Sequence, residues 1–188
     1  MYSEKLEKIL LDLENSKIHL AGGSAVGMVL SIVNSLIKYA SNLSLGKKKY
    51  ENIQDQIEEI IKKADDLKAN SMKVIDEDKE ILEEILKAYK TKKEDEKKYE
   101  LICRKSTDFC MDVVLLSYES LKLSDQISKI GNNLLESDFK ICKYYSEASI
   151  KAAIENVKIN AKEVRDKQYI SQTKKMCDDI LEKAKLLM

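Results

Sequence analysis

The chain contains no proline among its 188 residues and only 5 glycines. Folds rich in tight turns need both residues, because proline presets the backbone of a turn and glycine supplies its left-handed positions. The abundant Glu, Lys, Leu and Ile are ordinary helix formers. The sequence therefore predicts an all-α fold, a bundle of long helices. Its length suits one domain covering residues 1–188, and no internal repeat or linker divides it.

Apolar residues recur at helical spacing in six regions. The first region, residues 6–13, is short and amphipathic, and the second begins with Ser24 as its N-cap and ends at Gly46. The second region is apolar or small on almost every side until Lys38, which predicts a helix in the middle of a bundle or against a partner subunit. The other expected helices cover residues 52–90, 99–130, 137–159 and 170–187.

Charge and composition disfavour several classes of partner. The 33 Lys and Arg residues balance the 33 Asp and Glu residues, whereas a nucleic-acid-binding protein usually has a basic excess. The N-terminus is charged where a signal peptide would be apolar, and the most apolar stretch, residues 25–37, is interrupted by Ser31 and Asn34. We therefore expect a cytoplasmic protein that binds no nucleic acid and spans no membrane.

The cysteines do not suggest a metal site. No two of the 4 cysteines form a Cys-x-x-Cys pair, and there is 1 histidine in the chain. Structural metal sites need closely spaced ligands, so we expect no metal. Cysteines at helical spacing are instead expected to be buried as small apolar side chains in a reducing compartment.

One carboxylate lies on a predicted buried stripe. Asp78 falls three residues after Ile75 and four before Leu82, whereas the neighbouring charged residues lie off the stripe. Burial raises the pKa of a carboxyl group, and a general acid working near neutral pH needs a raised pKa. A helix break near Asp76 would instead turn Asp78 into solvent, and the periodicity leaves both alternatives open.

Other polar groups have two interpretations each. Gly22, Gly23 and Ser24 form either an anion cradle or an ordinary loop and cap. Lys47, Lys48 and Lys49 either bind an anionic tail or cap the preceding helix. Asn156 and Asn160 either hydrogen-bond a heterocycle or bridge helices. His19 is either a proton carrier or an exposed loop residue.

Four short motifs then follow one another in a familiar order. They are Leu20-Ala21-Gly22-Gly23-Ser24 with a helix ending at Lys47-Lys48-Lys49, Asp76-Glu77-Asp78, Gly131-Asn132 with Ser137-Asp138, and Asn156-Val157-Lys158-Ile159-Asn160. With this order and spacing, over about residues 1–185, the chain resembles the cyclodeaminase domain of formiminotransferase-cyclodeaminase and the related stand-alone bacterial methenyltetrahydrofolate cyclohydrolases.

The resemblance implies an all-α homodimer that binds a tetrahydrofolate derivative among its helices and needs no cofactor beyond this substrate. It implies Asp78 as the catalytic residue. The reaction would convert 5-formiminotetrahydrofolate to 5,10-methenyltetrahydrofolate and ammonia, or hydrolyse the methenyl compound. The candidate substrate-binding residues are Gly22, Gly23 and Ser24 through their amides, Lys47, Lys48 and Lys49 for the glutamate tail, Ser137 and Asp138 for the pterin, and Asn156 for the heterocycle.

The chain also departs from the family pattern. Leu20 and Ala21 stand where the family has proline and glycine, and Cys110 stands where a further proline is found. One alternative is therefore a non-catalytic helical dimer that has kept the fold and lost the folate chemistry. Another is a helical adaptor, although the nearly all-apolar second helix argues against it.

Overall fold

The computed structural model describes residues 2–15 and 17–188, and every regular element in this part of the chain is a helix. The all-α prediction is confirmed. Two short 3-10 segments, η1 and η2, join longer helices. In chain order the elements are α1 (Tyr2–Glu14), α2 (Gly22–Asn42), η1 (Lys48–Ile53), α3 (Gln54–Lys90), α4 (Glu96–Ile130), η2 (Asn133–Leu135), α5 (Glu136–Ala161) and α6 (Lys167–Lys185).

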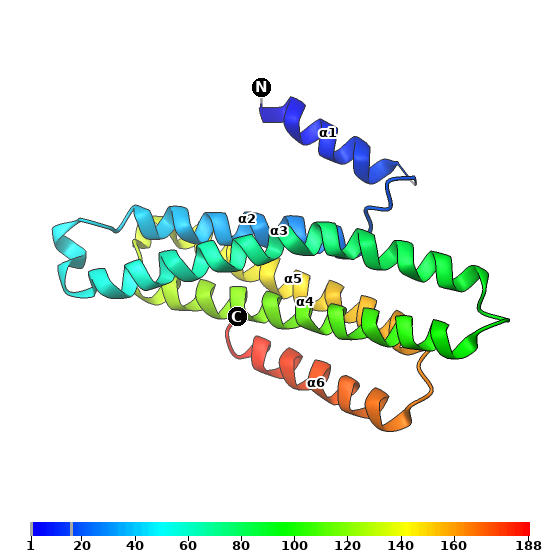
Figure 1. The fold of residues 1–188 in the computed structure, drawn as a ribbon. Coiled ribbons are helices and arrows are strands. Elements are labelled where there is room, and N and C mark those ends of the chain that lie inside the picture. Colours follow the sequence, from blue (N-terminus) through cyan, green and yellow to red (C-terminus); the bar gives the residue numbers. More distant parts are fainter. Residues whose placement is uncertain (1, 16) are drawn as a thin grey trace.

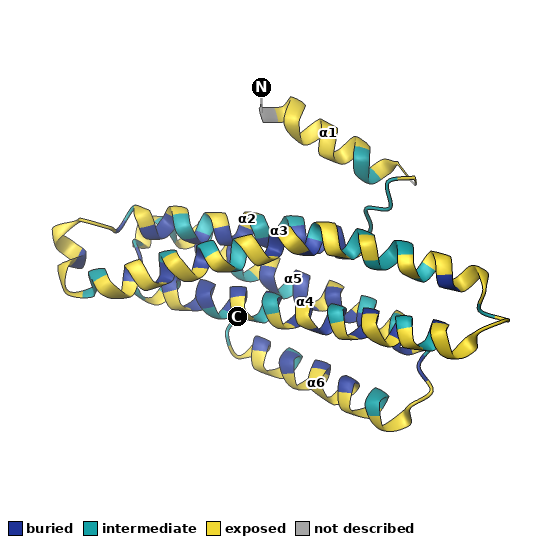
Figure 2. Cartoon of the chain, viewed as in Figure 1, coloured by how far each residue is buried: buried dark blue, intermediate teal, exposed yellow. Residues whose placement is uncertain are grey.

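Helices α2 to α5 form a four-helix bundle, with α2 packed against both α3 and α5 (Figure 1). Helix α1 projects away from the bundle, and α6 lies along α4 and α5. The buried faces of the four long helices meet in the interior, whereas α1 is almost wholly exposed (Figure 2). Side chains that are fully buried in this core include Leu30, Ile37, Leu121, Ile127 and Ile150.

Two helix boundaries differ from the sequence prediction. Helix α2 begins at Gly22 with Ala21 as its N-cap residue, and no side chain caps it, so the N-cap prediction for Ser24 is wrong. The Ser24 hydroxyl is drawn to α3 instead, where it donates to the carbonyl oxygen of Ile75 at 2.9 Å. At its other end α2 stops at Asn42, before the predicted Gly46, and a turn follows.

Helix α3 runs without interruption from Gln54 to Lys90. A helix break near Asp76, the alternative that would have exposed Asp78, is therefore excluded. Asp78 is half-buried, whereas Asp76 and Glu77 are exposed. The predicted stripe position of Asp78 is confirmed.

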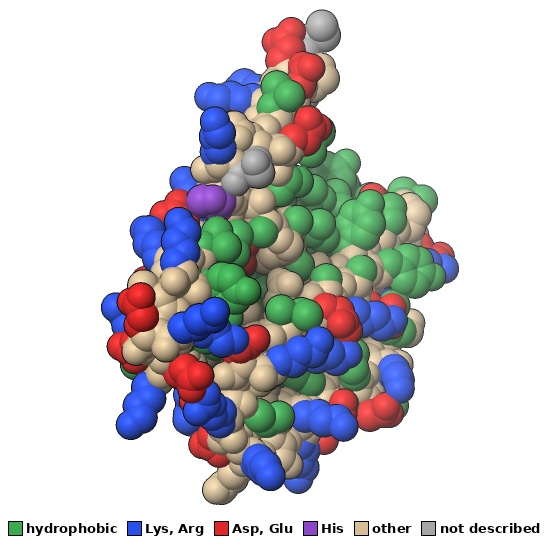
Figure 3. All heavy atoms as spheres, turned by 90° about the vertical axis from the view of Figure 1, so that its right-hand side faces the viewer, with side chains coloured by type: hydrophobic (Ala, Val, Ile, Leu, Met, Phe, Trp, Pro, Cys, Tyr) green, Lys and Arg blue, Asp and Glu red, His purple; other side chains and the backbone are tan. Residues whose placement is uncertain are grey.

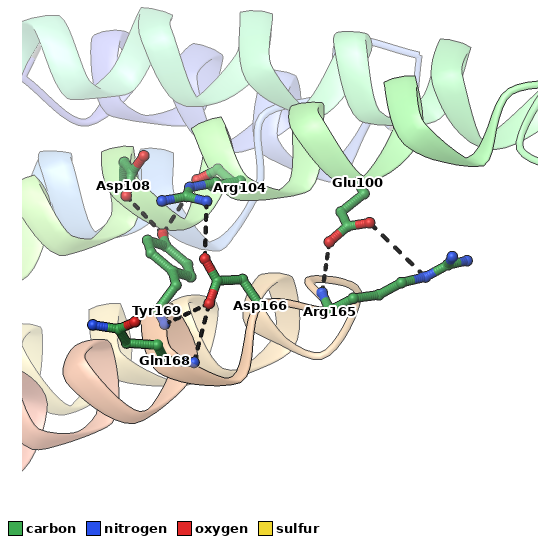
Figure 4. A network of polar contacts seen from close by, with 7 residues as sticks. All are labelled: Glu100, Arg104, Asp108, Arg165, Asp166, Gln168 and Tyr169. Atoms are coloured by element: carbon green, nitrogen blue, oxygen red, sulfur yellow. Dashed lines mark hydrogen bonds and ion pairs between the residues drawn. The ribbon is translucent and has the colours of Figure 1, made fainter.

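Polar contacts attach α6 to α4 (Figure 4). Asp166 caps α6 by accepting hydrogen bonds from the backbone N–H groups of Gln168 and Tyr169, and it also faces Arg104 of α4 at 3.5 Å. The Tyr169 hydroxyl donates to Asp108 of α4 at 2.6 Å. Cys177, Ile180 and Ala184 of α6 are also buried and pack into the core formed with α4 and α5, so both polar and apolar contacts hold α6 against the bundle.

The four cysteines and helix α2 bear on the expected compartment. Cys103, Cys110, Cys142 and Cys177 are all free and buried, as predicted.

Helix α2 is long and apolar enough to cross a membrane, with a mean hydropathy of 1.3 over its most apolar 18-residue window, but 50% of that window is buried in the bundle. The core helix of a bundle satisfies the same test. The expectation that α2 does not span a membrane stays a prediction.

Candidate active site

A cleft of about 190 Å³ opens at the N-terminal end of α2. Ser24, near the start of α2, contacts Asp78 of α3. The residues of α3 that follow Asp78 therefore extend beyond the N-terminal end of α2. The space that α2 leaves vacant is walled by α3, α4 and α5. The lining residues are Ala21, Gly22, Gly23, Asp78, Ile81, Leu82, Ile85, Ser106, Cys110, Asn156, Ile159 and Asn160.

A larger groove between α5 and α6, about 430 Å³, is lined mainly by apolar side chains and lysines. Its one lining carboxylate, Asp178, is exposed. The smaller cleft combines a half-buried carboxylate, two amide side chains and a helix N-terminus. We therefore identify the cleft at α2 as the candidate active site.

Asp78 is held by the first turn of α2. The backbone N–H of Ser24 donates to Asp78 Oδ2 at 2.8 Å, and the Ser24 hydroxyl lies 3.0 Å from the same oxygen. Because a helix N-terminus carries unpaired N–H groups and a partial positive charge, it stabilises a carboxylate there. Ser24 thus contacts the candidate catalytic residue directly, which the sequence did not predict.

Gly23 is required by the closeness of this contact. A Cβ atom at residue 23 would lie 2.0 Å from Asp78 Oδ1 and 2.5 Å from Asp78 Cγ. Real Cβ atoms do not approach other atoms so closely, so a larger residue would displace Asp78. The Gly-Gly pair therefore serves to bring the backbone of α2 against the carboxylate.

Burial raises the pKa of Asp78 above its ordinary value, while the two hydrogen bonds from Ser24 act in the opposite direction. The net shift is upward because loss of hydration outweighs the hydrogen bonds. A carboxyl group with a raised pKa exchanges protons closer to neutral pH. The direction of this shift is the one that a general acid working near neutral pH needs.

Asn156 and Asn160 of α5 both line the cleft, one helical turn apart. The Asn160 side-chain amide donates to Cys110 Sγ at 3.4 Å, and burial raises the pKa of the Cys110 thiol to about 11. Cys110 therefore stays protonated near neutral pH. Its place in the cleft was missed, because in the sequence it reads as a small apolar residue on a core stripe.

His19 lies just before the cleft, in the segment between α1 and α2. Its backbone has a φ of 61°, which is uncommon for a residue other than glycine. The Nδ1 atom lies 3.6 Å from Oε1 of Glu83 on α3 and makes no hydrogen bond to any described residue. His19 lies in the loop between α1 and α2, and its side chain is 33% exposed.

The remaining predicted site residues lie at the opposite end of the bundle. Helix α2 separates Gly22 from the lysines at residues 47–49 by about 30 Å, given a rise of 1.5 Å per residue over its 21 residues. Ser137 and Asp138 lie in the first turn of α5, and at 1.5 Å per residue Asn156 lies about 27 Å further along the helix. Within one chain the structure does not bring these five residues to the cleft, because α2 and α5 are straight helices.

Among residues 2–15 and 17–188, no group of three or more His, Cys, Asp or Glu side chains could hold a metal ion. The chemistry available in the cleft from these side chains is proton transfer, hydrogen bonding and apolar contact.

The fold and the cleft together define a helical-bundle protein in which a half-buried carboxylate from within α3 faces the N-terminal end of the buried helix α2. The family model for formiminotransferase-cyclodeaminase matches residues 5–179. The chain therefore belongs to the formiminotransferase-cyclodeaminase family, a family of folate one-carbon cyclodeaminases and cyclohydrolases.

Two relatives cover nearly the whole chain. A methenyltetrahydrofolate cyclohydrolase from Methylorubrum extorquens is 24% identical over 189 residues, which span 97% of this chain and 91% of that protein. The crystal structure of a formiminotetrahydrofolate cyclodeaminase from Thermotoga maritima superimposes with a TM-score of 0.83, covering 96% of this chain and 93% of that chain at 21% identity. The second comparison confirms the fold.

Proposed function

We propose that this chain acts on the one-carbon bridge between N5 and N10 of tetrahydrofolate, with Asp78 as the acid–base residue. The observation that supports this most directly is the half-buried carboxylate facing Ser24 in a cleft lined by two asparagines. The family and both named relatives support the same class of substrate. The two candidate reactions are cyclodeamination of 5-formiminotetrahydrofolate and hydrolysis of 5,10-methenyltetrahydrofolate.

In the cyclodeaminase reaction, N10 forms a bond to the formimino carbon on N5 and loses a proton, while the π pair of the C=N bond moves to the imino nitrogen. That nitrogen takes up two protons, one of them the proton lost by N10 and the other from solvent. The bond from the carbon to this nitrogen then breaks with its electron pair on the nitrogen, which leaves as ammonia, and the N5 and N10 lone pairs stabilise the cationic methenyl bridge. Asp78 accepts the proton from N10 and returns it to the leaving nitrogen. The cleft holds the two reacting atoms together, which lowers the entropic cost of ring closure.

In the cyclohydrolase reaction, water attacks the same carbon and a proton leaves the water. The new hydroxyl then loses its proton as the C=O bond forms, the bond from the carbon to N5 breaks with its electron pair on N5, and N5 takes up a proton. The product is 10-formyltetrahydrofolate, with one proton released to solvent. Both reactions pass through a tetrahedral carbon between N5 and N10. One carboxylate in one cleft therefore serves either reaction, and the substrate offered decides which is observed.

The binding roles of the neighbouring residues follow from their positions. The amides at Gly22 and Gly23 and the Asn156 side chain lie beside Asp78, where they would contact the pterin. We also propose that the protein acts in the cytoplasm, as a homodimer, without a metal, nucleic acid or membrane. The exact charge balance and the buried, unpaired cysteines support this proposal.

The test is absorbance of the methenyl chromophore, with the formimino and methenyl substrates offered separately in buffer containing a chelator. We expect turnover of at least one substrate by the natural chain. Asp78→Asn should lower it about 10²- to 10⁴-fold, the usual contribution of general acid–base catalysis. Asp76→Asn, a change of the exposed carboxylate in the same motif, should leave it unchanged.

Stability separates a catalytic effect from unfolding. Because the pKa of Asp78 is raised in the folded state, its charge destabilises the fold above the ordinary carboxyl pKa of 3.8. Asp78→Asn should therefore be at least as stable as the natural chain at pH 7. An Asp78→Asn protein with undiminished turnover would remove Asp78 from the mechanism. Absence of both turnover and saturable folate binding in the natural chain would favour the non-catalytic helical dimer.

A further inference from the structure

Cys110 holds the side chain of another cleft residue in one orientation. The Asn160 Nδ2 group of α5 donates a hydrogen bond to Cys110 Sγ of α4 at 3.4 Å. Both residues line the candidate active-site cleft, and Cys110 is 5% exposed. Because the nitrogen and oxygen of an amide point in different directions, this bond turns Asn160 Oδ1 away from the sulfur. Asn160 Oδ1 accepts no hydrogen bond from residues 2–15 or 17–188, so it can accept one from a ligand.

The cleft presents this amide and the Asp78 carboxylate from opposite walls. Asp78 belongs to α3, whereas Asn156 and Asn160 belong to α5, and α4 packs against both of these helices. At the first turn of α2 the walls are one backbone apart, because a Cβ atom at residue 23 would overlap Asp78 and one at residue 22 would lie 3.5 Å from Asn156 Oδ1. Asn160 lies one turn, about 6 Å, further along α5. A small group bound just beyond α2 therefore has Asp78 on one side and Asn160 on the other.

The carboxylate and the amide differ in what they can do with a proton. A carboxylate takes up and releases protons, whereas an amide oxygen accepts hydrogen bonds without being protonated near neutral pH. In the cyclodeaminase reaction, the exocyclic nitrogen carries one hydrogen in the imine and three when it leaves as ammonia. In the methenyl substrate, neither N5 nor N10 carries a hydrogen. A fixed hydrogen-bond acceptor beside the one-carbon unit therefore distinguishes the two substrates.

We propose that Asn160 Oδ1 accepts a hydrogen bond from the exocyclic nitrogen of the formimino group, that Cys110 is the residue positioning this amide, and that the cleft therefore favours cyclodeamination over hydrolysis. Under the proposed function, on which this assignment rests, the nitrogen gains hydrogens and positive charge before its bond to carbon breaks. The hydrogen bond to Asn160 then strengthens toward the transition state, which raises the rate of the reaction. Asn160 takes up no proton, and Asp78 still carries the proton from N10 to the leaving nitrogen.

Cys110 matters because an amide side chain can turn over. Rotation of the Asn160 amide by 180° would exchange its oxygen and nitrogen, and its N–H groups would then face the N–H groups of the leaving nitrogen. The bond to Cys110 Sγ is made only in the orientation that leaves Oδ1 facing away from the sulfur. Burial raises the pKa of Cys110 to about 11, and the charge of Asp78 adds to this effect. The thiol therefore stays neutral near neutral pH and adds no charge to the cleft.

Apolar surroundings strengthen the hydrogen bonds of this amide. Ile81, Leu82 and Ile85 of α3 and Ile159 of α5 line much of the remaining cleft surface. Figure 3 views the molecule from the end where α3 joins α4, and it shows hydrophobic side chains gathered on one side below α1. In surroundings of low polarity a hydrogen bond is electrostatically stronger than in water. One amide can therefore change the preference between two substrates measurably.

The substrate preference of an Asn160→Leu variant tests the role of the amide. Appearance of the methenyl chromophore measures one reaction, and its loss measures the other. Asn160→Leu, which keeps the size of the side chain, should lower kcat/KM about 10- to 100-fold for the formimino substrate and less than about threefold for the methenyl substrate. Partial unfolding would lower both values equally and leave their ratio unchanged. Asn156→Leu, the same change beside Gly22, should lower both reactions, because Asn156 is placed at the pterin.

Two substitutions of Cys110 test its positioning role. Cys110→Ala removes the acceptor and should reduce the preference for the formimino substrate about 3- to 10-fold, the usual value of one neutral hydrogen bond. Cys110→Ser restores an acceptor and should retain the natural preference. A buried hydroxyl packs no better than a methyl group, so a purely structural role predicts no rescue by serine. Cys142→Ala makes the same change at a buried cysteine outside the cleft and should leave the preference unchanged.

The outcomes separate this proposal from the proposed function. Equal losses for both substrates in Asn160→Leu, or no rescue in Cys110→Ser, would overturn the proposal. A natural chain that hydrolyses the methenyl substrate and leaves the formimino substrate untouched would also overturn it, while the proposed function would stand. If only the formimino substrate reacts, inhibition by the methenyl product becomes the reference, and Asn160→Leu should leave that inhibition unchanged. Turnover of neither folate would overturn the proposed function and this proposal together.

Discussion

At the scale of single residues, the candidate site depends on one close contact between a carboxylate and a helix N-terminus. Burial raises the pKa of Asp78, and the Ser24 N–H and hydroxyl keep the carboxylate in place. The contact exists only because residue 23 has no side chain. Two adjacent residues of α2, Gly23 and Ser24, thus determine where Asp78 lies and affect its pKa.

Gly23→Ala should therefore impair catalysis more than Gly22→Ala. A Cβ atom at residue 23 would overlap Asp78, whereas one at residue 22 would meet Asn156 at an ordinary 3.5 Å. We expect turnover to fall about 100-fold or more for Gly23→Ala, as expected when an acid–base group is misplaced, and several-fold for Gly22→Ala. Kinetics in the methenyl absorbance assay would measure both. Equal effects of the two substitutions would contradict this account of Gly23.

At the scale of helices, the site depends on how closely α2 approaches α3. A Cβ atom at residue 27 would lie 2.8 Å from the carbonyl oxygen of Ser71, so the two backbones are nearly in contact there. Ser24 lies about one turn closer to the N-terminus of α2 than Gly27. The close approach of the two helices at Gly27 therefore also brings Ser24 into contact with Asp78. Small residues on α2 thus position the contact between Ser24 and Asp78 as well as filling the core.

Gly27→Ala should destabilise the protein by about 1–3 kcal/mol, the usual cost of inserting a group into a packed core. The loss should appear although alanine favours the helix by about 1 kcal/mol over glycine. Urea unfolding followed by circular dichroism measures it. Ser35→Ala, at an exposed residue of the same helix, serves as control and should change stability by less than about 0.5 kcal/mol. A Gly27→Ala protein as stable as the natural chain would show that α2 and α3 can separate freely.

At the scale of the whole molecule, a buried ion pair fastens the chain's C-terminal end to the bundle. Lys143 of α5 lies 2.8 Å from Asp125 of α4 and donates to the carbonyl oxygen of Leu187 at 2.7 Å. Asp125 is 7% exposed. Its pKa lies below the ordinary value, because the bonds to Lys129 and Lys143 together outweigh the opposing effect of burial.

Lys143→Met should lower the free energy of unfolding at pH 7 by about 1–3 kcal/mol, because it removes a charged hydrogen bond and leaves the buried Asp125 paired only with the exposed Lys129. Lys129→Met removes the exposed partner and should cost less than about 1 kcal/mol. Since the pKa of Asp125 is lowered by folding, its stabilising effect is present above the ordinary carboxyl pKa of 3.8 and is lost as the pH falls through the folded value. The difference between Lys143→Met and the natural chain, followed by thermal unfolding, should shrink on acidification. A difference that persists unchanged at low pH would argue against the ion pair.

The amino-acid sequence by itself was enough to predict the helices, and it singled out Asp78 as a candidate while leaving its burial open. Absence of proline and the spacing of apolar residues depend on local backbone chemistry, which a sequence displays directly. Asp78 was recognisable because a carboxylate on an apolar stripe conflicts with its helical surroundings. The order of the family motifs along the chain can be read without a structure. The sequence therefore also indicated the class of substrate.

Which residues meet in space was decided by the tertiary structure. Asp78 contacts Ser24, and Cys110 lines the cleft, because of how helices from distant parts of the chain are aligned along their axes when they pack. The same packing set Lys47, Lys48, Lys49, Ser137 and Asp138 at the far end of the bundle. Helix direction and register arise from long-range contacts between side chains, and periodicity along one helix carries no information about them.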